Sequence, residues 1–317
     1  MLLYLIRRLI YTVPIALGVT LVVFSLVHLA PGDPISAIAP ADAPPEVVER
    51  LKHDYGYDRP LPVQYGIWLG RAATGDLGAS VATGERVAAQ VVVAVSNTFM
   101  LAVAAALVGF SLGLTLGFIA GYAQGSALDR LATGVAITGI SVPHYWLGMV
   151  LVIIFSVELG VLPAMGMGEG SSAEWAWDWV HMRSMVLPVI TLSVIPLGIV
   201  TRTVRATVAE ILSQEYVQAL RAKGLNEGRV LAHVAKNAAP TILAVIGLQF
   251  GYLLGGSILI ETVFSWPGTG FLLNNAIFRR DIPVLQGTIL VLALFFVLLN
   301  MLVDLAQTAI APRIKRS

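Results

Sequence analysis

The chain has 317 residues, of which 57% are hydrophobic and only 12% are charged. Soluble domains average about 25% charged residues, so this composition excludes an ordinary soluble globular protein and favours an integral membrane protein. The sequence contains no cysteine, which excludes disulfides and thiolate metal sites, and its net charge of +1 gives no electrostatic footprint for nucleic acid.

Six apolar stretches are each long enough to cross a hydrocarbon core, which takes about 20 helical residues. They cover residues 9–30, 94–121, 132–157, 185–204, 239–260 and 284–306. The first follows Arg7 and Arg8, as the core of a signal peptide would, but its apolar run is too long and Pro31 stands where cleavage would fall. We interpret it as a retained anchor. The sequence therefore predicts an all-α integral membrane protein with six transmembrane helices.

Charge is distributed unevenly between the segments that join these spans. Segments on one side hold 12 Lys and Arg against 4 acidic residues, and segments on the other side hold 8 against 14. The first set is the N-terminus, 122–131, 205–238 with Arg202, and 307–317; the second is 31–93, 158–183 and 261–283. Because cytoplasmic loops are enriched in Lys and Arg, both termini are predicted to be cytoplasmic, with a long external segment after the first helix.

Motifs for catalysis are missing from the sequence. A subunit that hydrolyses ATP needs the loop G-x-x-x-x-G-K-[ST], and none of the four lysines precedes Ser or Thr. The five histidines show no H-E-x-x-H element and no spacing typical of metal ligands. We predict a non-catalytic chain with no catalytic residues, no metal and no cofactor of its own.

Residues 215–229 carry the clearest local signals on the cytoplasmic side. Gly224 is predicted to end a short helix, because glycine enters the left-handed conformation at little cost. Asn226 is predicted to cap the next helix, with Glu227 in its first turn. The short helix is amphipathic, with Arg221 and Lys223 in its last turn, where the helix dipole favours cations. Two interpretations stay open: a membrane-surface helix beside lipid head groups, or a docking helix for a cytosolic partner.

This segment resembles the EAA loop of ABC importer permeases, which reads E-A-A, three residues, G, nine residues and I-x-L-P. Residues 218–220 (Gln-Ala-Leu) stand at E-A-A, Gly224 at the glycine, and residues 234–237 (Val-Ala-Lys-Asn) at I-x-L-P. The departures at Gln218, Lys236 and Asn237 resemble the dipeptide/oligopeptide/nickel branch. Further motifs of its B-type subunit follow in order at 31–34, 58–65, 75–78, 261–268, 280–287, 300–305 and 312–314.

The resemblance implies a type I ABC importer permease fold in the bacterial cytoplasmic (inner) membrane. The transmembrane permease core would be 94–307, preceded by a first helix with its external segment at 1–93 and followed by a tail at 308–317. The EAA-like loop would occupy about 210–238. The residues that the resemblance assigns to ATPase coupling are Gln218, Ala219, Arg221, Ala222, Lys223, Gly224 and Asn237.

The resemblance also implies a function and a set of partners. The chain would form half of a pathway for the uptake of short peptides; alternatives within the branch are nickel or other metal chelates, glutathione and opines. Its partners would be a second, C-type permease, two cytosolic ATPases that bind ATP and Mg, an external or periplasmic substrate-binding protein, and membrane lipid, with no nucleic acid. A stand-alone secondary transporter is less favoured, because the spans are nearly free of charge.

Four residues of the external segments are candidates for translocation, gating or binding-protein contact: Glu261, Trp266, Arg279 and Asp281. Glu261 is an ionisable group at the end of a span, although we favour a boundary carboxylate in water beside an interfacial Trp266. The same alternatives apply to Asp304 near the inner end of the last span. Arg279, Arg280 and Asp281 would receive a peptide carboxylate or a docked binding protein, or form a structural ion-pair cluster, which we favour.

Small and cyclic residues inside the spans predict how the helices pack. Two glycine series spaced by four predict close helix contacts, and Pro143 and Pro196 are predicted to kink their helices. The series are Gly109, Gly113 and Gly117 in one span and Gly247, Gly251 and Gly255 in another. Trp175, Trp177 and Trp179 are interpreted as an aromatic belt at the membrane interface, with a binding-protein contact as the alternative.

Overall fold

The computed structural model describes residues 13–25, 43–55, 58–168 and 173–310. Within these ranges the regular structure is helical, apart from one isolated antiparallel bridge between Ala79 and Arg86. The chain divides into two compact units. Unit 1 is Met1–Thr98 with Ser265–Leu298, and unit 2 is Phe99–Phe264 with Leu299–Ser317.

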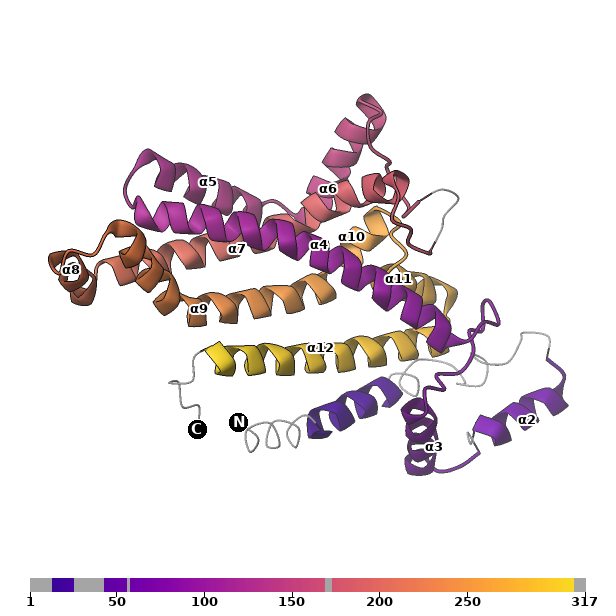
Figure 1. The fold of residues 1–317 in the computed structure, drawn as a ribbon. Helices are drawn as coiled ribbons and strands as arrows, with labels where there is room; N and C mark the ends of the chain where they lie inside the picture. The colour runs from indigo at the N-terminus through magenta and orange to yellow at the C-terminus, as the bar shows by residue number, and fades with distance from the viewer. Residues whose placement is uncertain (1–12, 26–42, 56–57, 169–172, 311–317) are drawn as a thin grey trace. The chain divides into compact units, whose positions relative to one another are not determined.

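Unit 1 contains the described part of residues 31–93, the segment that the charge distribution predicts to be external. Its helices are Val13–Ser25, α2 (Pro45–Tyr55), α3 (Leu61–Ala73), the beginning of α4 (Val87–Tyr122), α11 (Thr269–Arg279) and the beginning of α12 (Ile282–Ile310) (Figure 1). Proline suits the first turn of a helix, where its missing N–H is not needed. This explains why α2 begins at Pro45 and why α3 has a proline at its start.

Unit 2 contains the remaining long helices and the short helix between two of them. They are the rest of α4, α5 (Ala127–Ser141), α6 (His144–Val152) with the π-helical turn η2 (Ile153–Glu158), α7 (Trp179–Leu212), α8 (Glu215–Ala222), α9 (Glu227–Gly256), α10 (Ile258–Val263) and the end of α12. Helices α5 and α9 both pack against α7 (Figure 1).

Four helices of the described ranges are long and apolar enough to cross a membrane, and a fifth span exists if a bent pair is counted as one. The four are Val87–Tyr122, Trp179–Leu212, Glu227–Val263 and Ile282–Leu302. The bent pair, α5 with α6 and η2, turns by 94°. It covers the predicted span 132–157, which is therefore not one straight helix. The predicted first span, 9–30, lies partly outside the described residues, and its described part, Val13–Ser25, is shorter than a span.

Proline acts differently at its two predicted kink positions. Pro143 precedes the first residue of α6 and stands at the sharp bend, because a proline restrains the residue before it to extended backbone. Val142 accordingly has φ −84° and ψ 126°. Pro196 lies inside α7, together with Pro188, and α7 continues as one 34-residue helix through both.

The glycine series of α4 makes close contact with α7, as predicted. A Cβ on any of its members, which include one glycine more than predicted, would lie 2.7–3.0 Å from a backbone carbonyl oxygen of α7. The glycines are Gly109, Gly113, Gly117 and Gly121, opposite the carbonyls of Ser193, Leu197, Thr201 and Arg205. Such small residues let two backbones approach closely. The second series differs at its end, because a Cβ on Gly255 would meet nothing within 4 Å.

Candidate functional site at the α8 segment

Helix α8 ends in a glycine C-cap. Gly224 has φ +81°, and its N–H donates to the Arg221 carbonyl at 2.9 Å. The next N–H, of Leu225, reaches back to the Leu220 carbonyl at 3.3 Å. These two bonds form a Schellman motif, which satisfies carbonyls that a helix end leaves without partners. The predicted helix end at Gly224 is therefore confirmed, and the backbone there needs glycine.

Helix α9 begins at Glu227, three residues after that glycine. The Asn226 side chain accepts a hydrogen bond from the Arg229 N–H at 2.9 Å, which is the predicted cap. Glu227, in the first turn, accepts from Arg221 Nε at 2.8 Å and from Arg221 Nη2 at 3.3 Å. This hydrogen bond raises the pKa of the Arg221 guanidinium. The ion pair spans the turn and holds the end of α8 against the start of α9.

The apolar face of α8 is buried against the chain's own helices. Val217 has no exposed surface and belongs to a cluster with residues from the end of α7 and the beginning of α9. The other buried members are Val200, Val204, Val208, Ile211, Val230, Val234 and Ala238. Tyr216 and Leu220 of α8 pack against this cluster. In addition, the Asn237 side-chain amide of α9 donates to the Tyr216 hydroxyl at 3.1 Å. Helix α8 is therefore fixed to both of its neighbours.

The opposite face of α8 is exposed and carries small or polar side chains. Gln218, Ala219 and Ala222 lie on it, with Arg221 and Lys223 at its C-terminal end. Of the residues assigned to coupling by the family pattern, the structure thus brings six together around one short helix and its turn. The seventh, Asn237, lies on α9 and acts on α8 through Tyr216.

Glu261 occupies a different environment from the one favoured on sequence grounds. Its side chain is fully buried in unit 2, in the first turn of α10. The interpretation as a boundary carboxylate in water is therefore wrong. The side chain of Asp304 lies outside the described residues.

Trp266 is likewise fully buried, so it is not an interfacial anchor. Its indole N–H donates to the Asn97 carbonyl at 3.1 Å, and the Asn97 amide donates to the Pro267 carbonyl at 2.9 Å. The Thr98 hydroxyl accepts from the Thr269 N–H at 2.8 Å. These bonds attach the Trp266 loop to the beginning of α4, within unit 1.

Asp281 is a buried structural acceptor in unit 1, and only 3% of its surface is exposed. It accepts from the Ser80 hydroxyl at 2.5 Å and from the backbone N–H groups of Ala82 and Val81 at 3.2 and 3.3 Å. The favoured ion-pair cluster is therefore wrong for Asp281, whose acceptor bonds come from a hydroxyl and from backbone, although the role of these bonds is structural. Arg279 and Arg280 are exposed.

Two features of unit 2 were not predicted. One is an ion pair between Arg205 of α7 and the buried Asp129 of α5. The signal available in the sequence was a pair of opposite charges at adjoining ends of two spans. The other is a groove beside α7, lined by residues of α7 and by Ile140 of α5. In the described ranges, no group of three or more His, Asp or Glu side chains converges on a possible metal site.

Comparison with known proteins decides the family. The model of the binding-protein-dependent transport system inner membrane component matches residues 113–316, and the model of the N-terminal part of such components matches residues 1–102. The chain belongs to this family of ABC importer permeases. As a member of it, the chain is a multi-pass protein of the bacterial inner membrane and a transporter subunit.

Relatives within the family match this permease over its whole length. The dipeptide transport system permease protein DppB of Alkalihalophilus pseudofirmus is 38% identical over 99% of this chain and 100% of its own. The glutathione transport system permease proteins GsiC of Pectobacterium atrosepticum and Escherichia coli are each 38% identical, covering 99% of both chains.

A solved structure supports the fold of the permease. A chain of the inward-facing MetNI methionine ABC transporter matches with a TM-score of 0.57 and 17% identity. The match covers 69% of this chain and 95% of the other. At that identity the likeness concerns the fold, which is that of an ABC importer permease.

Proposed function

We propose that this permease forms half of the transmembrane pathway of an importer for short peptides, and that α8 is the helix through which cytosolic ATPases act on it. The observation that carries the coupling role is the burial of the apolar face of α8. Val217 is already fully covered by α7 and α9. The exposed face of α8 presents Gln218, Ala219 and Ala222, and these side chains allow another protein surface to approach closely.

The exposed face of α8 also argues against a membrane-surface helix. An interfacial helix inserts its apolar face among the acyl chains, and the binding strength grows with that apolar area. In α8 the apolar face is already buried inside the protein. Small side chains such as Ala219 and Ala222 add little lipid-binding area, but they let another backbone come near. We therefore infer a docking helix.

The proposed assembly follows the family. A second, C-type permease completes the pathway, two cytosolic ATPases bind the ATP and Mg, and an external binding protein delivers the solute. We propose six spans with both termini in the cytoplasm, the helix Val13–Ser25 being the described part of the first. The chain itself has no catalytic role in this scheme.

The proposed solute is a short peptide. Relatives named for dipeptide and for glutathione transport are equally identical to this chain, at 38%. Both solutes are small and carry free carboxylates, so glutathione is the alternative to a dipeptide. Affinities of the cognate binding protein for dialanine and for glutathione would decide between them.

A pair of matched glycine variants tests the coupling role. Gly224→Asp forces a side chain onto a backbone with φ +81°, so the turn and the direction of α8 should change. We expect uptake by the complete importer to be abolished, with membrane insertion intact. Gly228→Asp adds the same charge four residues later, where the nearest atom to a new Cβ is 3.8 Å away, and should retain uptake. Wild-type uptake by Gly224→Asp would refute the role of α8.

A further inference from the structure

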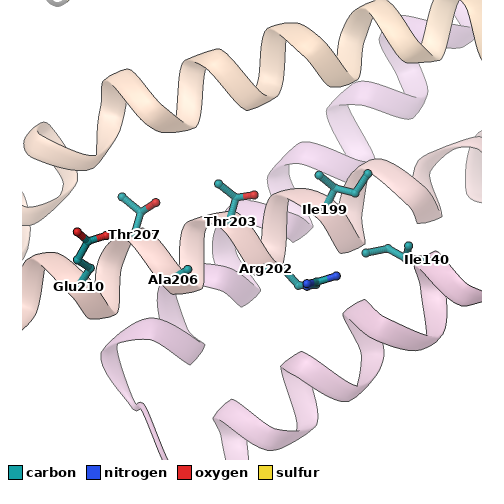
Figure 2. A pocket seen from close by; sticks show the side chains of 7 residues that line it. All are labelled: Ile140, Ile199, Arg202, Thr203, Ala206, Thr207 and Glu210. Carbon is teal, nitrogen blue, oxygen red and sulfur yellow. The ribbon is translucent and has the colours of Figure 1, made fainter.

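A groove runs along one face of α7 in unit 2. It has a volume of about 480 Å³ and is lined from α7 at regular helical intervals, with one residue from α5. The lining residues are Ile140, Ile199, Arg202, Thr203, Ala206, Thr207 and Glu210. Figure 2 shows Thr203, Thr207 and Glu210 on the same side of α7. The spacing of three, four, seven and eight residues places the α7 members in one stripe.

The other face of α7 is occupied by packing. Val200, Val204 and Val208 are buried there, as is Thr201, which has no exposed surface. The glycine series of α4 covers this side. Helix α7 thus has one face closed by protein and one open stripe that is more polar than the closed face.

The composition of the open stripe is unsuited to acyl chains. It contains a guanidinium, two hydroxyls and a carboxylate over three turns of helix. In the part of the chain that the structure describes, neither the Arg202 nor the Glu210 side chain makes a hydrogen bond or an ion pair. In the predicted span 185–204, Arg202 lies at the cytoplasmic end and Glu210 lies beyond it, where charged groups meet water or a partner. The stripe therefore fits water and a polar solute.

The position of the stripe relates it to α8. Helix α7 has 34 residues and is therefore about 50 Å long, while a hydrocarbon core is about 30 Å thick. The stripe occupies the last three turns before α8, so under the proposed function it lies at the cytoplasmic mouth. Its volume is within the range of about 300–1,000 Å³ typical of small-molecule sites.

We propose that this groove is part of the water-filled exit path of the importer, and that Arg202 receives the carboxylate of the departing peptide. The planar guanidinium pairs well with a carboxylate, and the hydroxyls of Thr203 and Thr207 offer hydrogen bonds to peptide amides along the same stripe. The inference rests on the proposed function, since it requires that the chain lines a peptide pathway.

Thiol labelling tests the groove directly, because the native chain has no cysteine. Thr203→Cys and Thr201→Cys would be compared in the complete importer in inside-out vesicles, with a charged, water-soluble thiol reagent. A reactive thiolate forms in water and is suppressed in apolar surroundings. We expect Thr203→Cys to be labelled and Thr201→Cys, on the closed face, to be protected. An unreactive Thr203→Cys would mean that lipid or a partner chain covers the stripe, and would overturn the proposal.

Protection by peptide tests the role of Arg202. Dialanine at millimolar concentration should slow the labelling of Thr203→Cys several-fold, and its C-terminal amide should not. Adding Arg202→Gln should remove the protection, which is expressed for each variant as the labelling rate with dialanine relative to its own rate without peptide. Arg130→Gln, at an exposed arginine outside the groove, is the control and should leave the protection intact.

Further comparisons separate this inference from its alternatives. If dialanine and its amide protect equally, or if Arg202→Gln leaves the protection unchanged, Arg202 does not bind the carboxylate. If dialanine protects only after phosphatidylcholine replaces the anionic lipids, an anionic lipid headgroup occupies Arg202 instead. The labelling requires neither ATP hydrolysis nor a binding protein, so it can succeed where the coupling role of α8 fails, and fail where that role stands.

Discussion

Arg205 of α7 donates two hydrogen bonds to the carboxylate of Asp129 in the first turn of α5, from Nε to Oδ1 and from Nη2 to Oδ2, the latter at 2.8 Å. Asp129 also accepts from the Gly125 N–H at 2.9 Å. One buried carboxylate thereby connects the turn between α4 and α5 to the C-terminal half of α7. Bidentate pairs of this kind fix geometry as well as charge.

Removing one partner of this pair should be more harmful than removing both. Asp129→Asn leaves the Arg205 guanidinium without its carboxylate, whereas Asp129→Leu combined with Arg205→Met replaces both charges by apolar groups. We expect the single variant to lower the melting temperature of the purified complex by several degrees and the double variant to recover most of it. Equal losses in both variants would show that the charge pair as such is unimportant.

The glycine contact of α4 with α7 predicts a large difference between two similar substitutions. Gly117→Ala places a Cβ 2.7 Å from the Thr201 carbonyl oxygen and from the Val204 Cβ, so the helices must move apart. Such overpacking costs about 1–3 kcal/mol of unfolding free energy. Gly134→Ala, on α5, meets nothing within 4 Å and should be neutral or slightly stabilising. Thermal unfolding of the two variants in the same detergent would measure the difference.

The ion pair across the α8 turn predicts a charge-swap rescue. Arg221→Glu opposes Glu227 and should loosen the turn, with a severalfold loss of uptake. Adding Glu227→Arg restores the pair in reverse and should restore most of the uptake, because the pair acts by holding α8 against α9. If the double variant stays as inactive as the single one, Arg221 touches the ATPase directly. Comparing uptake and ATPase co-purification for the three proteins would decide.

The environment of Asp76, just after the end of α3, predicts that the stability of the fold depends on pH. The hydrogen bond from Arg71 Nε at 2.9 Å, helped by the Gly78 N–H at 3.0 Å, holds the Asp76 pKa below its ordinary value of 3.8. Since the folded state holds the proton less tightly than the unfolded state, the stabilisation is present above pH 3.8 and is lost as pH falls through the lowered pKa. It should be small, below about 1 kcal/mol, because the pair is exposed.

The matched variant for this pH dependence is Asp76→Asn. At neutral pH it should unfold at a slightly lower temperature than the wild type, and the two melting curves should converge in acid. A difference that persists unchanged below the lowered pKa would assign the effect of the substitution to something other than the charge of Asp76.

Local signals of known geometry were predictable from the sequence. The glycine stop at Gly224, the cap at Asn226 and the close approach of α4 each depend on residues a few positions apart, whose conformational preferences act alone. The bend at Pro143 is of the same kind. Its angle was not predictable, because it depends on how α5 and α6 pack against α7.

Environments made by distant segments were not predictable. Glu261 and Trp266 looked like boundary residues because their neighbours in sequence are a turn and a helix end. In the structure both are fully buried, and the bonds of Trp266 reach back to Asn97, about half the chain away. The pairing of Asp129 with Arg205 likewise requires α5 to lie along α7, which no local pattern specifies.

The seating of α8 has a mechanical consequence. Because Val217 is held by side chains of both α7 and α9, a force applied to α8 is divided between two membrane helices at once. Under the proposed function, α8 would pass a movement of the ATPases to both helices at once, and a more flexible turn at Gly224 would weaken that transfer. Because the polar stripe lies on α7, the same proposed movement would also change the width of the proposed exit path.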